Sequence, residues 1–386
     1  MYSYVLSTAY VPQVLRLGII IPILKKTSLD PNKPENFRPI TLSSVHSKLF
    51  ELIMLPNDDV SDNQFGFRSG RGTSFVCSTI NDAVAYFTHN DSPVFMCSLD
   101  AEKCFDSIWH DGLFFKLRSK LCPQHWLFLY NWYKVSCAMV RWNGHLSEQF
   151  LITKGMKQGS ILSPTLFNIF IDDLLKVLQS NSNGIRISDL KLNSLGYADD
   201  ISVFSSTAPG LQSLVDECSF YAKSWRFKFG MKKTRCMTFG KSPLKSSPNW
   251  LYNSDRIITS DNVDILGVNF NPMLNYSKHI ENRMHSCRSN IFRLTSVGMC
   301  YPGMCSEAKA YLWNSIGSPT LMYGMESISL SNTNVNTLKS IQGCTVKRVM
   351  GFPKRSHHTN LQHALAIPTI DNLLHKSTVG LFHRLF

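Results

Sequence analysis

The sequence predicts an α+β protein, with strand-rich segments over most of the first 275 residues and helices over the remainder. Short apolar runs bounded by turn residues recur before residue 276, as in strands joined by loops. After residue 276, apolar residues recur every three or four positions, which is the spacing of an amphipathic helix. Hydrophobic residues make up 44% of the 386 residues and charged residues only 17%, so the chain can bury a sizeable core.

The first predicted element is a pair of strands over residues 17–24 and 37–42, joined by a polar connector. The connector contains Pro31, Asn32 and Pro34, which favour turns. Ser43 or Ser44 then has the chemistry of an N-cap for a helix that runs through Ile53, and residues 56–59 (Pro-Asn-Asp-Asp) end that helix.

Two acidic positions follow apolar runs. Residues 93–100 form a short apolar run that ends in Asp100, as a buried strand does when it delivers a carboxylate into a cleft. Asp199 and Asp200 lie between two β-rich runs, which is typical of a hairpin tip. Taken alone, an Asp-Asp pair is more often a solvated turn.

Carboxylates from separate elements repel one another when they are brought together. Two divalent cations about 3.5–4 Å apart offset that repulsion in sites for phosphoryl and nucleotidyl transfer. Oxygen-only ligands favour Mg²⁺ or Mn²⁺. Asp100, Asp199 and Asp200 therefore predict a site for two such ions.

The later part of the chain alternates strands and helices. Ser163 and Pro164 begin a helix with a broad apolar face, on which Asp172 and Asp173 are expected to lie on the solvated side. Short strands are expected over residues 234–239 and 263–270, and helices over 280–294, 338–349 and 369–386.

The formal net charge is +13, from 40 Lys and Arg against 27 Asp and Glu. This excess favours a polyanionic partner such as nucleic acid, although solubility alone is the alternative. Eleven scattered cysteines without a Cys-x-x-Cys pair disfavour a disulfide framework and a structural zinc. We expect a non-secreted, intracellular protein, with nucleus and cytoplasm not distinguished. The apolar run 17–24 is too short to cross a bilayer, so no membrane partner is expected.

Residues 197–200, Tyr-Ala-Asp-Asp, are the signature of reverse transcriptases, and the chain resembles the reverse transcriptase of a LINE-type (non-LTR) retrotransposon. Further matches follow in the family's order. Those in the fingers are residues 36–40, 64–68 and 70–74. Residues 155–167 resemble the template- and nucleotide-positioning motif, and the remaining matches are residues 99–106 with His110 in the palm, 233–234 in the later palm strand, and 266–268. The last of these resembles the primer-grip turn. Residues 276–386, with the sequence Tyr-Gly-Met-Glu at 323–326, resemble the thumb and the segment after it.

The resemblance implies a right-hand polymerase fold. Residues 1–93 would form the fingers, 94–275 the palm with its antiparallel sheet and an inserted fingers segment, and 276–386 the helical thumb and following segment. The implied activity is that of an RNA-directed DNA polymerase, which extends a primer 3′-hydroxyl on an RNA template by two-metal nucleotidyl transfer.

The implied partners are an RNA template, a DNA primer and dNTPs. An endonuclease domain of the parent element is expected elsewhere or lost. The alternative is a catalytically inactive, truncated copy that only binds nucleic acid.

The resemblance also implies a role for each site residue. Asp100 and Asp199 would bind both metal ions, and Asp200 completes the catalytic and metal-binding set. Tyr197 and Ala198 belong to the hairpin motif, and Asp106 resembles a family acid with a structural role.

The implied substrate contacts lie around these acids. Lys25 and Arg38 would bind the triphosphate, Phe105 would lie under the sugar and exclude a 2′-hydroxyl, Gln158 and Gly159 would approach the nascent base pair, and Lys233 would neutralise the leaving pyrophosphate. The alternatives are an ordinary core residue at Phe105, solvated charges at Lys25 and Arg38, and a strand-edge lysine at Lys233.

Overall fold

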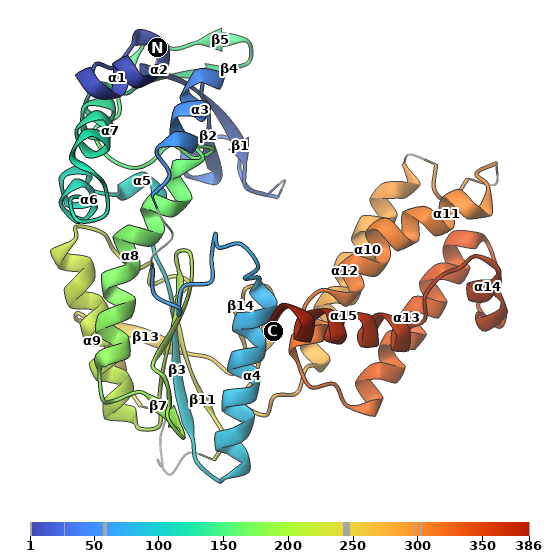
Figure 1. Ribbon diagram of the computed structural model, residues 1–386. Helices are drawn as coiled ribbons and strands as arrows, with labels where there is room; N and C mark the ends of the chain where they lie inside the picture. The colour runs from blue at the N-terminus through green and yellow to red at the C-terminus, as the bar shows by residue number, and fades with distance from the viewer. Residues whose placement is uncertain are drawn as a thin grey trace. The chain divides into compact units, whose positions relative to one another are not determined.

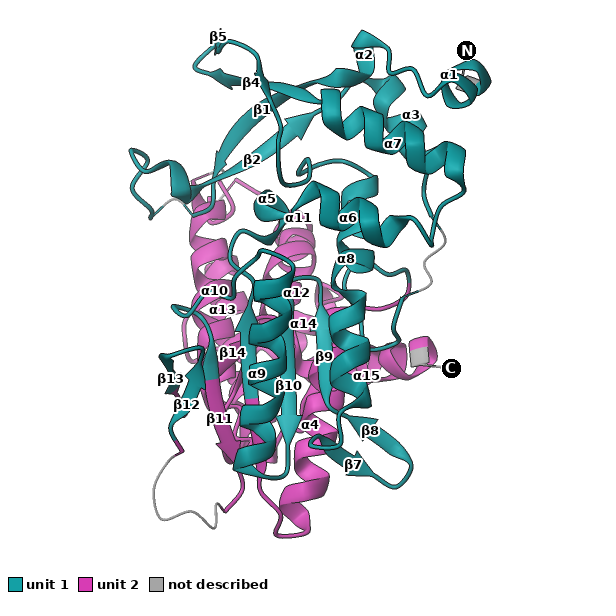
Figure 2. Ribbon diagram, turned by 90° about the vertical axis from the view of Figure 1, so that its left-hand side faces the viewer, with its two compact units in different colours: residues 1–69, 97–235, 249–258 teal, residues 70–96, 236–248, 259–386 magenta. Residues whose placement is uncertain are grey.

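A computed structural model describes residues 2–26, 28–56, 60–241, 248–296, 298–301 and 303–385 (Figure 1). The chain divides into two compact units, which are coloured in Figure 2. The first comprises Met1–Ser69, Cys97–Arg235 and Asn249–Ile258, and the second comprises Gly70–Met96, Cys236–Pro248 and Thr259–Phe386. Because this division follows compactness, the boundaries expected after residues 93 and 275 stay predictions.

A five-stranded sheet in the first unit is built on the predicted hairpin. β1 (Leu17–Leu24) pairs antiparallel with β2 (Phe37–Leu42), so both predicted strands are confirmed at both ends. β4 (Cys137–Trp142) runs parallel to β1 on its other side. The short strands β5 (His145–Leu146) and β6 (Phe150–Leu151) pair with β4.

Helices of the first unit pack together beside this sheet. They are α1 (Tyr2–Thr8), α2 (Gln13–Arg16), α3 (Val45–Ile53), α6 (His110–Leu117) and α7 (Pro123–Val135). The Ser44 hydroxyl accepts the N–H of Ser47 at 3.1 Å, which confirms the predicted N-cap of α3. The expected end of this helix falls partly on residues 57–59, which lie outside the described residues.

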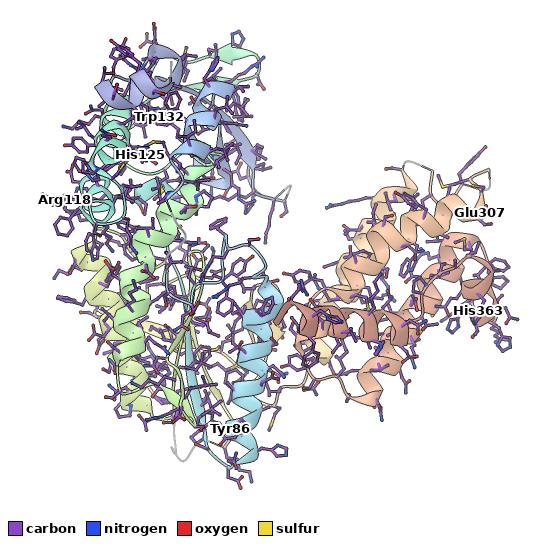
Figure 3. All side chains as sticks on the ribbon, in the orientation of Figure 1. Tyr86, Arg118, His125, Trp132, Glu307 and His363 are labelled. Atoms are coloured by element: carbon purple, nitrogen blue, oxygen red, sulfur yellow. The ribbon has the colours of Figure 1, made fainter. Side chains whose placement is uncertain are left out.

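Aromatic side chains form the core between α3 and α7. Phe50 of α3 stacks on Phe128 of α7 at 5.3 Å between ring centroids. Trp132, which is labelled in Figure 3, meets the ring of Phe50 edge-on and donates its indole N–H to the carbonyl of Leu15 at 2.7 Å. The helices are therefore fixed to one another by large buried rings as well as by backbone geometry.

A six-stranded sheet has the order β12-β13-β11-β3-β10-β9. Its strands are β3 (Val94–Asp100), β9 (Ser194–Tyr197), β10 (Asp200–Ser205), β11 (Arg235–Phe239), β12 (Trp250–Tyr252) and β13 (Asp255–Thr259). The predicted strand ending in Asp100 is thus confirmed, and β3 and β11 are divided between the two units. α8 (Leu162–Ser180) packs on β9 and α9 (Ala208–Ser224) on β10, and the two helices lie side by side (Figure 1). A small hairpin, β7 (Ile185–Ile187) with β8 (Leu190–Leu192), follows α8.

α8 begins at Leu162, one residue before the predicted start, and Pro164 lies in its first turn as expected. The prediction that Asp172 is solvated is wrong, because its side chain is 3% exposed. Asp172 accepts the N–H of Ser61 and pairs with Lys176, each at 2.6 Å. The helical spacing alone could not show that the segment around Ser61 crosses this face.

The second unit contains α4 (Thr73–His89) and a hairpin of β14 (Val263–Ile265) and β15 (Val268–Phe270). The single strand expected over residues 263–270 is therefore two strands, because Leu266 and Gly267 form the turn between them.

Helices form the rest of the second unit. They are α10 (Ser277–Thr295), α11 (Ser306–Leu312), α12 (Ser318–Met322), α13 (Asn332–Met350), α14 (Thr359–Ala364) and α15 (Ile370–Leu385), with a π-helical turn η2 (Trp313–Gly317) and a 3-10 turn η3 (Met325–Ser327). The three predicted helical segments are confirmed in α10, α13 and α15. Within the described ranges, no helix combines the length and the apolar character needed to span a bilayer.

A buried lysine joins α6, α8 and α9 in the first unit. Lys116 is 8% exposed, and its ammonium donates to the carbonyl of Phe170 at 2.6 Å and to the Tyr221 hydroxyl. It also pairs with Asp173 at 3.0 Å and lies 3.8 Å from the ring centroid of Trp225. Burial lowers the pKa of Lys116 to about 8, although the charge of Asp173 acts in the opposite direction.

We predict that this lysine makes stability rise with pH. The pKa of Lys116 is about 8 in the folded chain and about 10.4 in an unfolded chain. Between these values the unfolded state binds more protons, so the free energy of unfolding increases with pH. From pH 7.5 to 9.5 the native chain should gain about 2 kcal/mol relative to Lys116→Met, which keeps the bulk and loses the charge. Urea denaturation of both proteins at the two pH values measures the difference. Parallel pH dependence would contradict the prediction.

Candidate active site

The predicted acids come together where β3 ends beside the β9–β10 hairpin. Asp200 pairs with Tyr197 in this hairpin, which leaves Ala198 and Asp199 as a two-residue turn and confirms the predicted tip. Asp100 is the last residue of β3, and the N–H of Ala101 donates to the carbonyl of Asp199 at 3.3 Å. Backbone pairing therefore sets the two carboxylate-bearing segments side by side.

The turn itself is strained and is held by residues 64–66. Ala198 has φ 55°, a left-handed conformation that a residue with a Cβ rarely adopts. The side-chain oxygen of Gln64 accepts the N–H of Ala198 at 2.9 Å, and its amide nitrogen donates to the carbonyl of Ala198 at 3.4 Å. A Cβ on Gly66 would collide with the backbone nitrogen of Ala198. Gln64 and Gly66, in the motif at residues 64–68, therefore support the turn at Ala198, a role that the sequence alone did not reveal.

Asp100 is held by the loop that precedes β11. The N–H of Gly230 donates to the carbonyl of Asp100 at 2.7 Å, and the ammonium of Lys233 donates to its carboxylate at 2.6 Å. Burial disfavours the charged ammonium, but the bond to Asp100 and the nearby carboxylates raise the pKa of Lys233 overall. Lys233 lies in this loop, two residues before β11 begins.

Burial and nearby negative charges raise the pKa values of Asp199 and Asp200. Burial raises the pKa of Asp199, although hydrogen bonds from its own backbone N–H and from the Cys104 thiol oppose the shift. Burial together with the charges of Asp199 and Asp100 raises the pKa of Asp200 to about 6. The negative charge here is therefore incompletely compensated by the protein.

Phe105 and Asp106 lie on a short helix, α5 (Cys104–Ser107), which follows the strand that carries Asp100. The ring of Phe105 stacks on Phe167 at 4.9 Å and meets Phe67 edge-on at 5.9 Å. These neighbours fix a half-buried ring. Asp106 accepts a hydrogen bond from the side-chain amide of Gln158 at 2.8 Å.

Gln158 and Gly159 are bound to β2 through their backbone. The N–H of Thr41 donates to the carbonyl of Gln158 at 2.6 Å. Gly159 has φ 105°, and a Cβ there would lie 3.0 Å from the carbonyl oxygen of Thr41. Glycine is therefore required both by the backbone conformation and by the close approach of β2.

The two candidate triphosphate ligands lie at one end of the β1–β2 hairpin. Arg38 is on β2, opposite Ile23. Lys25 directly follows the last residue of β1. Its N–H donates to the carbonyl of Asn36, and its ammonium donates to the carbonyl of Glu35 at 2.7 Å. Both side chains are exposed.

One cavity of ≈1040 Å³ collects most of the predicted residues. Those that line it are Lys25, Arg38, Asp100, Phe105, Asp106, Gln158, Gly159, Asp199 and Lys233. Tyr197, Ala198 and Asp200 are not among its lining residues. The volume matches that of ligand pockets in general, and all of the lining residues belong to the first unit.

Sequence reasoning missed several lining residues. Cys104 is buried beside Asp199 and hydrogen-bonds to its carboxylate. Tyr252 and Asn253 reach the cavity from the β12–β13 hairpin. Further cations surround it, namely Lys103, Lys157, Lys223, Lys228 and Lys232. The sequence signal was the lysine-rich run at 228–233, of which only Lys233 was singled out.

The carboxylates in the cavity are oxygen donors of the kind that a divalent cation needs. Among the described residues, no three His, Cys, Asp or Glu side chains are grouped as a complete metal site. Asp100 and Asp199 nevertheless line the same cavity with oxygen donors only. Mg²⁺ is commonly held by one or two carboxylates together with water and substrate phosphates. The carboxylates of Asp100 and Asp199 fit such an ion.

Known proteins match most of this chain. The family described as "Reverse transcriptase (RNA-dependent DNA polymerase)" matches residues 23–270. The chain is 24% identical over 388 residues to the RNA-directed DNA polymerase from mobile element jockey of Drosophila melanogaster, covering 97% of this chain and 42% of that protein. It is 29% identical over 284 residues to the Pol polyprotein of the R2DM retrotransposable element of the same species, covering 69% of this chain and 26% of that protein.

The chain therefore spans less than half the length of these relatives. Among solved structures, apo telomerase from Candida tropicalis aligns with 100% of this chain and 67% of its own, at 11% identity and a TM-score of 0.49. The family match covers the strands and helices that carry Asp100, Asp199 and the cavity. The chain belongs to the reverse transcriptase family, as its resemblance to LINE-type elements predicted, and has that family's α+β fold.

Proposed function

We propose that this chain is an RNA-directed DNA polymerase that extends a DNA primer on an RNA template. The supporting observation is that Asp100 and Asp199 line one cavity together with Phe105, Gln158 and the cations Lys25 and Arg38. Metal-binding carboxylates and phosphate-binding cations are the two requirements of nucleotidyl transfer.

Asp100 and Asp199 would hold Mg²⁺ or Mn²⁺, with Asp200 beside them. The bound ions supply activation of the primer 3′-oxygen and neutralisation of charge on the transferred phosphate. Lys25 and Arg38 would bind the triphosphate, where guanidinium–phosphate hydrogen bonds are strong. The side chain of Lys233 is 72% exposed, so it can leave Asp100 and neutralise the departing pyrophosphate.

Primer extension on poly(rA)/oligo(dT) by the purified chain tests this function. Extension that depends on Mg²⁺ and dTTP is the expected result. Binding of the hybrid without extension would instead favour the alternative of an inactive copy that only binds nucleic acid.

The metal assignment predicts the behaviour of Asp199→Asn. This change should lower the rate of Mg²⁺-dependent extension by roughly 10²- to 10³-fold or more, the scale seen when a group that stabilises transition-state charge is removed. The affinity for the RNA–DNA hybrid should stay close to that of wild type, because the substitution changes only one of the chain's many charges. Asp189→Asn, at a fully exposed position, is the matched control and should extend normally. Normal extension by Asp199→Asn would remove the metal assignment.

The net charge of +13 predicts binding by counterion release. For an RNA–DNA hybrid, log K should fall linearly with log[salt], with weak sequence preference, because phosphate contacts position a duplex without reading its bases. Filter binding over a salt series measures the slope. A flat response would show that the basic excess has no part in nucleic-acid binding.

The ring of Phe105 predicts selection of deoxyribonucleotides. Because Phe167 and Phe67 hold this ring, a 2′-hydroxyl could fit only by displacing packed side chains. Phe105→Ala or Phe105→Val should reduce discrimination against GTP relative to dGTP by roughly 5- to 150-fold in kcat/KM. Phe115→Ala, which removes a ring that is 73% exposed, is the control and should discriminate like wild type. An unchanged ratio in the Phe105 variants would make this ring an ordinary core residue.

A further inference from the structure

Glu51 is buried on the inner side of α3, whereas apolar side chains are exposed on the outer side. Glu51 is 3% exposed, while Val45 is 72% and Leu52 is 52% exposed. A buried carboxylate is costly unless it is hydrogen-bonded or paired with a cation. The groups that compensate Glu51 therefore indicate what it does.

The partners of Glu51 are the residues that begin α8. Its Oε2 accepts the N–H of Ile161 at 2.7 Å, and the Ser160 hydroxyl and the N–H of Leu162 also bond to the carboxylate. Burial raises the pKa of Glu51, and these hydrogen bonds and the charge of Lys157 oppose the shift. Ile161 is the N-cap of α8 and offers no side-chain cap of its own. Glu51 thus supplies the negative group that a helix N-terminus favours.

The segment that Glu51 holds is part of the cavity wall. Residues 157–160 line the cavity, and Ile161 follows them directly. β2 fixes this segment at the carbonyl of Gln158 through Thr41, at 2.6 Å. Glu51 fixes its other end at Ile161. Asp100 and Asp199 are carried by other elements, β3 and the β9–β10 turn.

We propose that Glu51 is a positioning residue for the incoming nucleotide. It acts by holding residues 157–161 against the cavity, so that Gln158 and Gly159 keep one place relative to the nascent base pair. The proposal rests on the polymerase function proposed above. Under this proposal, the positions of Gln158 and Gly159 depend on Glu51, whereas the positions of Asp100 and Asp199 do not.

The kinetic test compares Glu51→Ala, Glu51→Gln and wild type on one primed RNA template. Losing charge-assisted hydrogen bonds to the segment should raise KM for the dNTP by roughly 10- to 100-fold in Glu51→Ala. The Kd for the RNA–DNA hybrid should not change. Glu51→Gln keeps an acceptor for Ile161 and should give an intermediate KM. Selectivity against mismatched dNTPs should fall in the same order.

Ser44→Ala is the matched control, because it removes the N-cap of the same helix without touching residues 157–161. It should lower stability and leave KM unchanged. If both Glu51 variants show the wild-type KM, or if Ser44→Ala raises KM as much as they do at an equal loss of stability, the proposal is overturned. If Glu51→Ala does not fold, Glu51→Gln alone decides, through the same KM and hybrid Kd.

Hydrogen exchange gives a readout that needs no catalysis. In Glu51→Gln, the amides of Ile161 and Leu162 should exchange faster, while those of β9 and β10 keep their protection. Unchanged exchange at Ile161 and Leu162 would overturn the proposal even in an active enzyme. If wild type fails to extend a primer while Ile161 and Leu162 still exchange faster in Glu51→Gln, the polymerase function is contradicted. That outcome would still support the role of Glu51 in fixing residues 157–161.

Discussion

The hydrogen bonds between Gln64 and Ala198 are the constraint on which the proposed chemistry depends. A two-residue hairpin turn with positive φ at its first position normally has Gly there. Ala198 takes that place at φ 55°, at a cost of roughly 1–2 kcal/mol. The Gln64 amide bonds to both the N–H and the carbonyl of Ala198 and offsets this cost. Without this support the turn would relax, and Asp199 would leave its place beside the end of β3.

Other parts of the cavity wall are also held by hydrogen bonds from neighbouring segments. Several segments of the cavity wall are fixed by backbone hydrogen bonds from a neighbouring segment, in addition to those made by the side chains of Gln64 and Glu51. Gly230 holds Asp100, Thr41 holds Gln158, and Asp199 itself accepts the N–H of Ala101. A carboxylate or an amide can then respond to substrate without unfolding its surroundings. Pre-organised supports of this kind are what positioning catalysis requires.

Much of this architecture could be predicted from the sequence because it depends on local pattern. The β1–β2 hairpin, the Ser44 cap, the strand ending in Asp100 and the acidic turn all follow from alternation, turn residues or capping chemistry. The missed features depend on contacts between segments distant in sequence. Asp172 is buried because the segment around Ser61 crosses it, 111 residues away, and no periodicity records that crossing.

The local sequence pattern did not predict which charged residues are buried. The contacts of these residues nevertheless give information about function. Charged residues are seldom buried without partners, so each one identifies a structural demand. Lys116 joins three helices through Phe170 and Tyr221, and its role is architectural. Glu51 bonds to the segment that lines the cavity, so its burial serves the position of that segment. The partners of a buried charge, rather than the charge itself, therefore distinguish a residue that supports the fold from one that supports the site.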